Sequence, residues 1–244
     1  MNLRSEVYHL IEKAFDAPAH VIGRITHRYY FEDYVRIYPD GKKYLYLGIN
    51  KDALSSDINN FRNHCKFYHF ASQFVDRAGI LDAGCGSGYG SKILFDAGRP
   101  TSIIGCDISG HAIKYARSHF SQYAKLCESS ILEMSQFFDS AFNVGICNEV
   151  LERVKEYGKE GQTISEIKRV TQAGGLLIFG TPNSEFLGGH GFYFDEIEML
   201  VARNFEKYCI FENAFLPFDS NSLEKWEKRL NTNKTGVIIS EKYN

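Results

Sequence analysis

From residue 79 onward, the sequence predicts an α/β fold with a largely parallel sheet, on the basis of three observations. Short apolar strand segments alternate with helical segments, as in parallel strands joined by right-handed crossovers. The segment ILDAGCGSGYGSKIL, residues 80–94, places a glycine-dense loop between the first strand and the first helix. Asp107 closes the second strand. In open sheets of this kind, ligands bind at the carboxyl ends of the strands.

The expected elements follow one another without an internal repeat. Runs of apolar strand residues alternate with segments whose apolar residues recur at helical spacing. The helix over 160–175 is expected to end at the pair Gly174-Gly175. We expect strands at 79–84, 101–109, 123–130, 142–150, 176–183, 206–215 and 235–244, and helices at 89–98, 110–120, 160–175, 195–205 and, shorter, near 220–230.

The N-terminal part has a different pattern. Residues 1–15 predict an amphipathic helix. Aromatic and β-branched residues on both sides of Pro39-Asp40-Gly41 predict a hairpin that turns there. A helix expected over 59–79 leads into the first strand of the sheet and carries His64. This histidine lies either on the helix surface, which the pattern favours, or near a bound ligand over which the helix closes.

Composition and charge argue against several classes of protein. The 244 residues are 44% hydrophobic and 24% charged, as in a globular chain with one large core. A net charge of -2 argues against nucleic acid or an anionic membrane as a partner. No apolar run approaches a membrane span, and the first residues lack the apolar stretch of a secretion signal. Six cysteines without a CxxC pair favour a reduced, cytoplasmic compartment and argue against a zinc site.

The glycine loop predicts a ligand that touches bare main chain. Its glycines allow a sharp turn and a close approach, and the following helix start presents N–H groups to an anion. Asp107 lies 19 residues after Gly88, where a carboxylate can accept both hydroxyls of a ribose. The ligand therefore contains a nucleoside, and NAD and S-adenosylmethionine both qualify. The observed spacing G-x-G-x-G does not fit the dinucleotide fingerprint G-x-G-x-x-G, which disfavours NAD.

Several segments in order resemble class I S-adenosylmethionine-dependent methyltransferases. They are LDAGCGSGYGS with IIGCDIS, then FNVGICNEVLERV, EIKRVTQAGGLLIFGTPN and GVIISEK, and the resemblance covers residues 61–244. It implies a Rossmann-like sheet of seven strands, mostly parallel, with a reversed last strand. It also implies S-adenosylmethionine as the cofactor and residues 61–244 as the methyltransferase domain. Residues 1–60 then form an extension with a helix and a hairpin, as a lid or a dimer contact.

The resemblance assigns residues to the cofactor. Asp107 is expected at the ribose hydroxyls, with Ile108 beside the adenine, and Asp82 beside the methionine part. Ser130 stands where relatives usually carry an acid near the adenine amine, and its hydroxyl can still accept that hydrogen bond. The residues expected to contact the cofactor are Asp82, Gly84, Cys85, Gly86, Gly88, Asp107, Ile108, Ser130, Ile131 and Asn148.

Catalytic roles are expected of two residues, Glu149 and His190. Glu149 follows the fourth strand together with Asn148, and the resemblance places both under the methyl group. His190 lies in the glycine-flanked loop after the fifth strand, which commonly faces the acceptor in this family. A histidine there can take a proton near neutral pH, although a local hydrogen bond within the loop explains it equally well.

Four residues are expected to bind the acceptor. Arg153 replaces the histidine of the Glu-Val-Leu-Glu-His-Val pattern common in relatives, and it pairs either with an anionic substrate group or with a neighbouring glutamate. Because arginine stays protonated, it cannot act as a base. Tyr193 stacks on the acceptor or packs under its loop. His27 and Tyr30, in the N-terminal extension, line a substrate lid, form a dimer contact or simply pack.

The function that the resemblance favours is methylation of an oxygen on a small molecule or a sugar-like glycan precursor. The fourth strand ends in CNEV, not in the Asn/Asp-Pro-Pro-aromatic pattern of enzymes that methylate amino groups of bases. An alternative is a cofactor-binding or regulatory module without catalysis, because Ser130 and Arg153 depart from the pattern. The glycine spacing disfavours an oxidoreductase. We expect a small-molecule or sugar substrate and no nucleic acid, membrane or metal partner, while the hairpin serves either as a lid or as a homodimer contact.

Overall fold

The computed structural model describes residues 30–32, 35–37, 63–182, 184, 191–212 and 235–241. Its large sheet contains β3 (Gly79–Ala83), β4 (Ser102–Asp107), β5 (Lys125–Glu128), β6 (Phe142–Asn148), β7 (Thr171–Pro182), β8 (Tyr208–Glu212) and β9 (Thr235–Glu241). The helices are α3 (Tyr89–Gly98), α4 (Gly110–Phe120), α5 (Leu151–Lys155), α6 (Glu160–Val170) and α8 (Phe194–Asn204). Helical residues 63–71 and the short turn η1 (Ser72–Phe74) precede β3.

The large sheet is parallel except at one strand. Its order is β5-β4-β3-β6-β7-β9-β8. The strands from β5 to β7 pair in parallel, whereas β9 runs antiparallel to both β7 and β8. The α/β class is confirmed, and the reversed strand is the last one along the chain. The chain builds outward from β3 to β5 and then resumes at β6 on the other side of β3. The switch in strand order therefore lies between β3 and β6, where ligands of such sheets bind.

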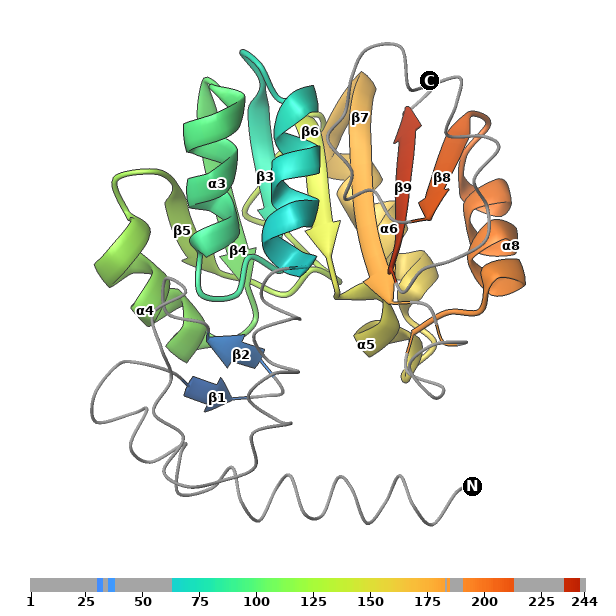
Figure 1. Cartoon of the computed structure of the whole chain (residues 1–244), viewed down its shortest axis with the longest axis horizontal. Coiled ribbons are helices and arrows are strands. Elements are labelled where there is room, and N and C mark those ends of the chain that lie inside the picture. Colours follow the sequence, from blue (N-terminus) through green and yellow to red (C-terminus); the bar gives the residue numbers. More distant parts are fainter. Residues whose placement is uncertain are drawn as a thin grey trace.

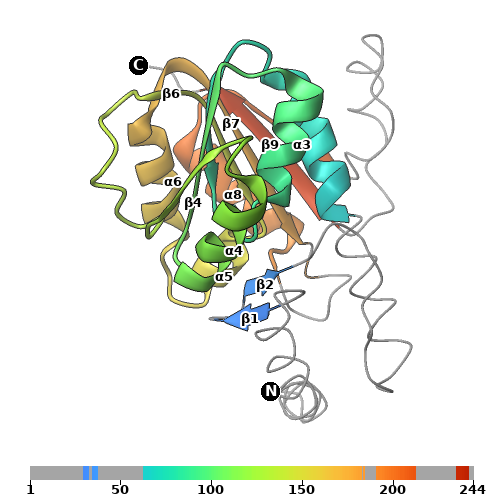
Figure 2. The ribbon, with the colours of Figure 1, turned by 90° about the vertical axis from the view of Figure 1, so that its left-hand side faces the viewer.

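Helices cover both faces of the sheet (Figures 1 and 2). The helix over 63–71, α3 and α4 pack on one face, and α5, α6 and α8 pack on the other. Adjacent residues of β3 serve different cores: Ile80 faces the first group of helices and Leu81 faces the second, and neither is exposed. Burial of a side chain of this size contributes about 1.5–3 kcal/mol. With both faces covered, the carboxyl ends of the parallel strands are where a ligand reaches the sheet.

The boundary between α6 and β7 differs from the expected one. The helix expected to reach Gly175 ends at Val170, and β7 begins directly at Thr171. Thr171 takes an extended conformation, with φ -90° and ψ 137°, and its hydroxyl donates to the Ile167 carbonyl at 2.8 Å. Gly174 has a φ of +72°, and the pairing of β6 with β7 shifts register nearby. The glycine pair therefore lies in an irregular stretch of β7 and does not end the helix.

The described residues of the N-terminal part contain a short antiparallel pair of strands within the first arm of the expected hairpin. β1 (Tyr30–Glu32) and β2 (Val35–Ile37) pair antiparallel, so the first arm of the expected hairpin folds back on itself between Glu32 and Val35. A connection of two residues is enough for the tightest hairpins, so this pairing is compatible with the length of chain between the strands. The two strands lie beside α4 (Figure 1). The turn expected at 39–41 and the helices expected over 1–15 and near 220–230 lie outside the described residues.

Three further features concern the described residues as a group. No helix among them is both long and apolar enough to cross a membrane. Cysteines 65, 85, 106, 127 and 147 are free thiols. Within the same part of the chain, no three His, Cys, Asp or Glu side chains gather in a group able to hold a metal ion.

The helix over 63–71 lies directly on α3 and on the end of β7 because glycines make room for it. A Cβ on Gly90 would come within 2.1 Å of the Tyr68 ring, and one on Gly180 within 2.7 Å of the Phe67 ring. Tyr68 and Phe67 are both almost completely buried. The two glycines therefore hold this helix against the carboxyl ends of the central strands.

Replacing Gly90 with Ala is expected to lower the free energy of unfolding by about 1–3 kcal/mol, because the added methyl group overpacks the contact with Tyr68. Urea unfolding of the purified chain measures this change. Gly161→Ala, in α6, is the matched control, because no atom lies within 4 Å of its added Cβ. The control is expected to gain about 0.5–1 kcal/mol from the lower flexibility of the unfolded chain. Equal losses in both variants would contradict the packing account.

Candidate functional site

The glycine loop over 84–88 is tied to the end of the neighbouring strand β4. Its three glycines have φ values of +81°, +52° and +86°, a region that favours glycine. The N–H groups of Gly84 and Cys85 donate to the Cys106 carbonyl at 2.8 and 3.0 Å. The Gly86 N–H donates to Asp107 Oδ2 at 2.9 Å. Because these N–H groups already have partners, a ligand over this part of the loop meets Cα atoms and carbonyl oxygens.

Close packing accounts for two of the loop glycines as well. A Cβ on Gly84 would lie 2.3 Å from Val150, and one on Gly88 would lie 2.9 Å from Ala116 of α4. The Cys85 side chain is buried against Gly105, and burial raises the pKa of its thiol well above the usual value. Cys85 therefore presents only its main chain to a ligand.

Asp82, at the end of β3, lies beneath the loop and is completely buried. The Tyr68 hydroxyl donates to its Oδ1 at 3.0 Å, and the Ser91 hydroxyl donates to its Oδ2 at 2.6 Å. Burial raises the pKa of Asp82 to about 6, although these two hydrogen bonds favour the charged form. Asp82 thus joins the helix over 63–71, β3 and α3, and its contact with the methionine part stays a prediction.

At the end of β4, Asp107 offers hydrogen-bond acceptors, and the neighbouring Ile108 offers an exposed apolar surface. The Asp107 carboxyl is buried, and its Oδ1 accepts the Ser109 N–H at 2.9 Å, while Oδ2 accepts from the loop. Burial raises the pKa of this carboxyl as well. A carboxylate has about four acceptor positions, so this group keeps capacity to accept from a ribose. Ile108 is 63% exposed, which suits a planar ring packed on it.

Ser130 and Ile131 follow β5 and differ in what they offer a ligand. The Ser130 hydroxyl accepts the Leu132 N–H at 3.2 Å, which leaves its own hydrogen and one lone pair for another partner. Ile131 is 7% exposed and packs in the same core as Met134. The Ile131 side chain therefore contributes mainly to the core beneath this part of the site.

Asn148, the last residue of β6, carries an acceptor without a partner. Its side chain lies against Gly180, and Oδ1 is buried and receives no hydrogen bond from the described residues. An unsatisfied buried group of this kind costs about 1–3 kcal/mol. A ligand that donates a hydrogen bond here would remove that cost.

Glu149 stands at a strained position beside the switch in strand order. Its φ is +53°, unusual for a residue with a side chain, and such strain costs about 1–3 kcal/mol. Its N–H donates to the Gly180 carbonyl at 2.8 Å. Its Oε2 lies 2.7 Å from His64 Nε2, and His64 Nδ1 lies 2.6 Å from the Tyr89 hydroxyl. Strain of this kind clusters at functional sites, so the carboxylate is a strong candidate for a role in the reaction.

Glu152, on α5, is a second acid of the site, which the sequence did not single out. It is 2% exposed, the Thr181 hydroxyl donates to its Oε2 at 3.3 Å, and Oε1 is buried without a partner among the described residues. Burial and the nearby charge of Glu149 raise the pKa of Glu152 to about 8. Its position in the helix that directly follows Glu149 is the only signal in the sequence, and its burial depends on the packing of α5 on the sheet.

Of the other residues expected to act on or bind the methyl acceptor, only some lie among the described residues. Arg153 is exposed on α5, close enough to Glu152 to favour its charged form. Tyr193 is 49% exposed at the start of α8, where its N–H donates to Glu196. Lys155 of α5 lies 2.6 Å from the Glu196 carboxylate and joins the two helices. His27 and His190 lie outside the described residues. Tyr30 is the first residue of β1, and only its backbone is among the described parts of the structure.

The arrangement suits a ligand with an adenosine-like end and a reactive end. The loop, Asp107 and exposed Ile108 lie at the ends of β3 and β4. Asn148, with its unsatisfied acceptor, and Glu149 follow β6 on the other side of β3. S-adenosylmethionine fits this donor and acceptor set.

A family described as methyltransferase domain matches residues 75–235 of the chain. The match begins just before β3 and contains all of the strand ends described above. It also contains α5 and both acids, Glu149 and Glu152.

Curated relatives match parts of the chain. A probable S-adenosylmethionine-dependent methyltransferase of Mycolicibacterium smegmatis is 27% identical over 123 residues, 50% of this chain and 45% of that protein. A ubiquinone biosynthesis O-methyltransferase of Nitrosomonas europaea is 31% identical over 111 residues, 43% of each chain. The matched part thus spans less than half the length of these relatives.

Among solved structures, the fold is similar to a chain in the complex between the Haloferax volcanii Trm112 methyltransferase activator and a putative methyltransferase. The TM-score is 0.59 at 16% identity, over 79% of this chain and 95% of that one. An identity this low supports the fold alone.

Replacing Asp107 with Ala is expected to weaken the binding of S-adenosylmethionine by about 1–3 kcal/mol, because hydrogen bonds to a charged group are lost. Isothermal calorimetry measures the affinity. Asp96→Ala is the matched control, because this aspartate is exposed on α3 and pairs with Lys92. Unchanged affinity in the Asp107 variant would contradict its role at the ribose.

Replacing Glu152 with Gln is expected to flatten the pH dependence of stability between pH 6 and 8. The ordinary pKa of Glu152 is 4.5 and the folded one about 8, so the folded state holds a proton in this window that the unfolded state has lost. The free energy of unfolding of the unmodified chain therefore falls as pH rises, by up to about 1.4 kcal/mol per pH unit. Asp82, whose pKa is about 6, adds to this slope mainly at the lower end of the window.

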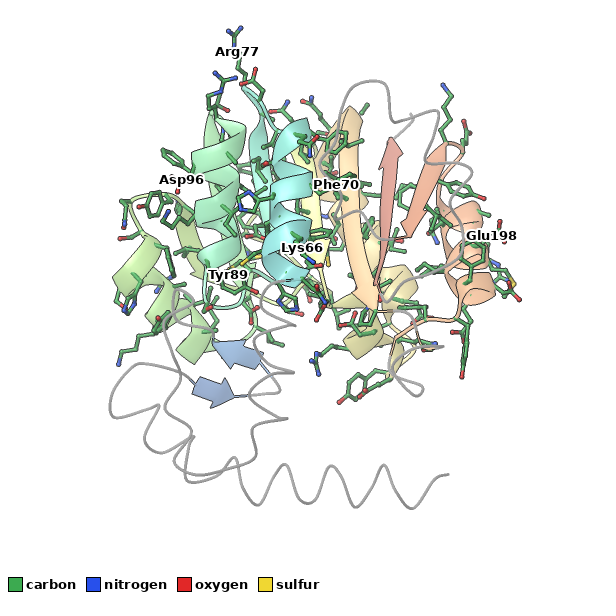
Figure 3. The ribbon with its side chains drawn as sticks, viewed as in Figure 1. Lys66, Phe70, Arg77, Tyr89, Asp96 and Glu198 are labelled. Atoms are coloured by element: carbon green, nitrogen blue, oxygen red, sulfur yellow. The ribbon has the colours of Figure 1, made fainter. Side chains whose placement is uncertain are left out.

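Urea unfolding at a series of pH values measures this slope. Glu198→Gln on α8 is the control, since Glu198 is exposed (Figure 3). A slope that persists in the Glu152 variant would show that this carboxyl is ionised in the folded chain.

Proposed function

The chain belongs to the family of S-adenosylmethionine-dependent methyltransferase domains, and on this premise we propose that it methylates a hydroxyl oxygen of a small-molecule or sugar-like acceptor. The observation that carries the proposal is the pair Glu149 and Glu152 beside the switch in strand order. The two carboxyls stand in opposite environments, one with an imidazole partner and one buried with a neutral hydroxyl. Such a pair is typical of sites that separate an ionised group from a protonated one.

The cofactor half of the proposal rests on the ends of β3 and β4. Bound S-adenosylmethionine supplies a methyl group on a sulfonium, which is already a good leaving group. Asp107 accepts the ribose hydroxyls, Ile108 supports the adenine and the loop carbonyls face the methionine part. These residues need only to bind and orient, because alignment of the reacting atoms lowers the barrier.

The presence of a carboxylate that can act as a base supports oxygen as the atom that receives the methyl group. A hydroxyl at neutral pH keeps its proton until the reaction, so a carboxylate near the methyl group assists by accepting it. Glu149 takes that role, and the raised pKa of Glu152 leaves the negative charge of the pair on Glu149. The similarity to a ubiquinone biosynthesis O-methyltransferase supports the same acceptor atom.

The remaining assignments are part of the proposal. Arg153 and Tyr193, near the ends of α5 and α8, contact the acceptor. His190 assists the proton transfer from the loop after β7, and His27 and Tyr30 approach from the extension. Residues 1–60 serve as a lid or a homodimer contact for the methyltransferase domain of residues 61–244, and a cytoplasmic location suits the free thiols.

A cofactor-binding module without catalysis is the alternative. It is favoured by Ser130 and Arg153, which replace an acid and a histidine usual in relatives. The two functions differ in one measurement, the formation of demethylated cofactor from S-adenosylmethionine in the presence of hydroxyl acceptors. A screen of nucleotide sugars, phenols and hydroxy acids that yields no product, while the cofactor binds, would favour the module.

Replacing Glu149 with Gln is expected to lower kcat about 10²–10⁴-fold while the affinity for S-adenosylmethionine stays within a factor of about two, because a base is lost but the cofactor contacts remain. Mass spectrometry of the methylated product with an acceptor from the screen measures kcat. Glu156→Gln is the control, because Glu156 is exposed at the end of α5. His190→Ala tests the second catalytic residue in the same assay, and full activity there would remove His190 from the mechanism.

A further inference from the structure

Lys155, the last residue of α5, makes three contacts with the segment that leads into α8. Its Nζ donates to the Gly191 carbonyl at 3.1 Å and to Glu196 Oε2 at 2.6 Å, and it lies 4.6 Å from the centroid of the Phe192 ring. The face of an aromatic ring attracts a cation in this position. The charge of Lys155 is therefore used within the protein, where it joins α5 to the start of α8.

The same segment is also fixed to the end of β7. The Phe192 N–H donates to the Pro182 carbonyl at 3.0 Å, and the Phe192 carbonyl accepts the Ser184 N–H at 2.9 Å. Gly191 has a φ of +110°, and a Cβ there would lie 2.1 Å from the Pro182 carbonyl oxygen, so only glycine suits this position. The Phe192 side chain is 4% exposed and packs in the same core as Ile197. The main chain at 191–192 is thus held at the carboxyl end of β7.

Tyr193 is held through the carboxylate that binds Lys155. The Tyr193 N–H donates to Glu196 Oε2 at 2.9 Å, and Lys155 donates to the same oxygen. The hydrogen bonds from Lys155 and from Tyr193 lower the pKa of Glu196, so this carboxylate stays charged near neutral pH. The helix α5 itself begins two residues after Glu149 and lies at the carboxyl ends of β6 and β7 (Figure 1). Lys155 therefore links the position of Tyr193 to the turn that carries Glu149.

A second lysine makes the same kind of contact at the other end of α8. Lys168 of α6 donates to the Asn204 carbonyl at 2.6 Å and lies 5.1 Å from the centroid of the Phe205 ring. Because α8 starts after the carboxyl end of β7 and leads into the start of β8, its end at Asn204 lies at the opposite edge of the sheet. The two lysines hold the two ends of α8, and only Lys155 does so at the edge that carries the site.

We propose that Lys155 is a positioning residue for the methyl acceptor, which through Glu196 holds Tyr193 in place relative to Glu149. The inference rests on the proposed function, because it takes Tyr193 as a contact of the acceptor and Glu149 as the base. Tyr193 is 49% exposed, so its ring is open to such a ligand. The contacts of Lys155 then determine how tightly the acceptor binds, and they affect the cofactor and the transfer step much less.

The experiment compares Lys155→Met with the matched control Lys168→Met. Each variant keeps an apolar side chain and loses one ammonium, so each is expected to lower the thermal unfolding temperature by about 2–4 °C. Only Lys155→Met is expected to raise the KM for the acceptor, roughly three- to tenfold, while kcat and the affinity for S-adenosylmethionine stay within a factor of about two. Mass spectrometry of the methylated product measures KM, with the acceptor found among nucleotide sugars, phenols and hydroxy acids. Calorimetry measures the affinity for the cofactor.

Glu196→Gln tests whether Lys155 acts through Glu196. This variant keeps an oxygen that can accept the Tyr193 N–H but removes the charge that faces Lys155. It is expected to raise the acceptor KM, and the double variant with Lys155→Met is expected to raise it no further than Lys155→Met alone, because partners in one network are not additive. Effects that multiply in the double variant would overturn the link from Lys155 to Tyr193.

A second readout does not need turnover. Amide hydrogen exchange, followed by NMR, reports local opening of the segments that the two lysines hold. In Lys155→Met the amides of Ser184 and Phe192 are expected to exchange about tenfold faster, whereas the Phe205 amide, which is bonded to the Val201 carbonyl, is unchanged. Lys168→Met is expected to show the reverse pattern. The thermal unfolding temperature shows that each variant is folded.

The outcomes separate the inference from the proposed function. A chain that methylates no acceptor, but shows the crossed pattern of exchange, would remove the proposed function and leave the hold of Lys155 on residues 191–196 intact. An unchanged acceptor KM in folded Lys155→Met would overturn the positioning role. An equal rise of KM in Lys168→Met would also overturn it, because the effect would then follow the stability of α8 as a whole. Unchanged exchange at Ser184 and Phe192 in Lys155→Met would show that the segment is held without this lysine.

Discussion

The hydrogen bonds between the glycine loop and the end of β4 are the constraint on which the rest of the site depends. The Cys106 carbonyl accepts two loop N–H groups, and the Asp107 carboxylate accepts a third. These bonds place the loop across the ends of two strands and hold Asp107 in a buried position with acceptor capacity to spare. Because the same carboxylate serves the loop and the ligand, the shape of the loop and recognition of a ribose are not independent.

A second constraint acts through the helix over 63–71. Its Tyr68 binds Asp82 below the loop, its Phe67 lies on Gly180, and its His64 reaches Glu149. One helical face therefore touches the ends of β3, β6 and β7. In relation to the reaction, this helix positions side chains that come from distant parts of the chain, so a change in its packing is transmitted to the carboxylate.

Parts of the site were predictable because they depend on local chemistry. The first strand, the glycine loop and Asp107 lie within about thirty residues of one another along the chain, and a parallel sheet brings the ends of such strands together. The end of α6 was not predictable in the same way. Thr171 leaves the helix because its backbone pairs with β6, a partner remote in sequence, and Gly174-Gly175 then serve an irregular strand. In the N-terminal part, the pairing of residues 30–32 with 35–37 was likewise not predicted, because the choice of strand partner does not follow from the composition of the strands.

The sequence by itself determined the alternation of strands and helices, the order of the motifs and the residues at the strand ends, because these depend on neighbours along the chain. Only the tertiary structure decided that Glu149 lies beside His64, that His64 contacts Tyr89, and that Glu152 is buried with a raised pKa. A pKa depends on burial and on nearby charges, and both are set by contacts between segments distant in sequence. For His64, the helical pattern favours the surface without excluding a place near the ligand, and its contact with Glu149 depends on how the helix is placed on the sheet.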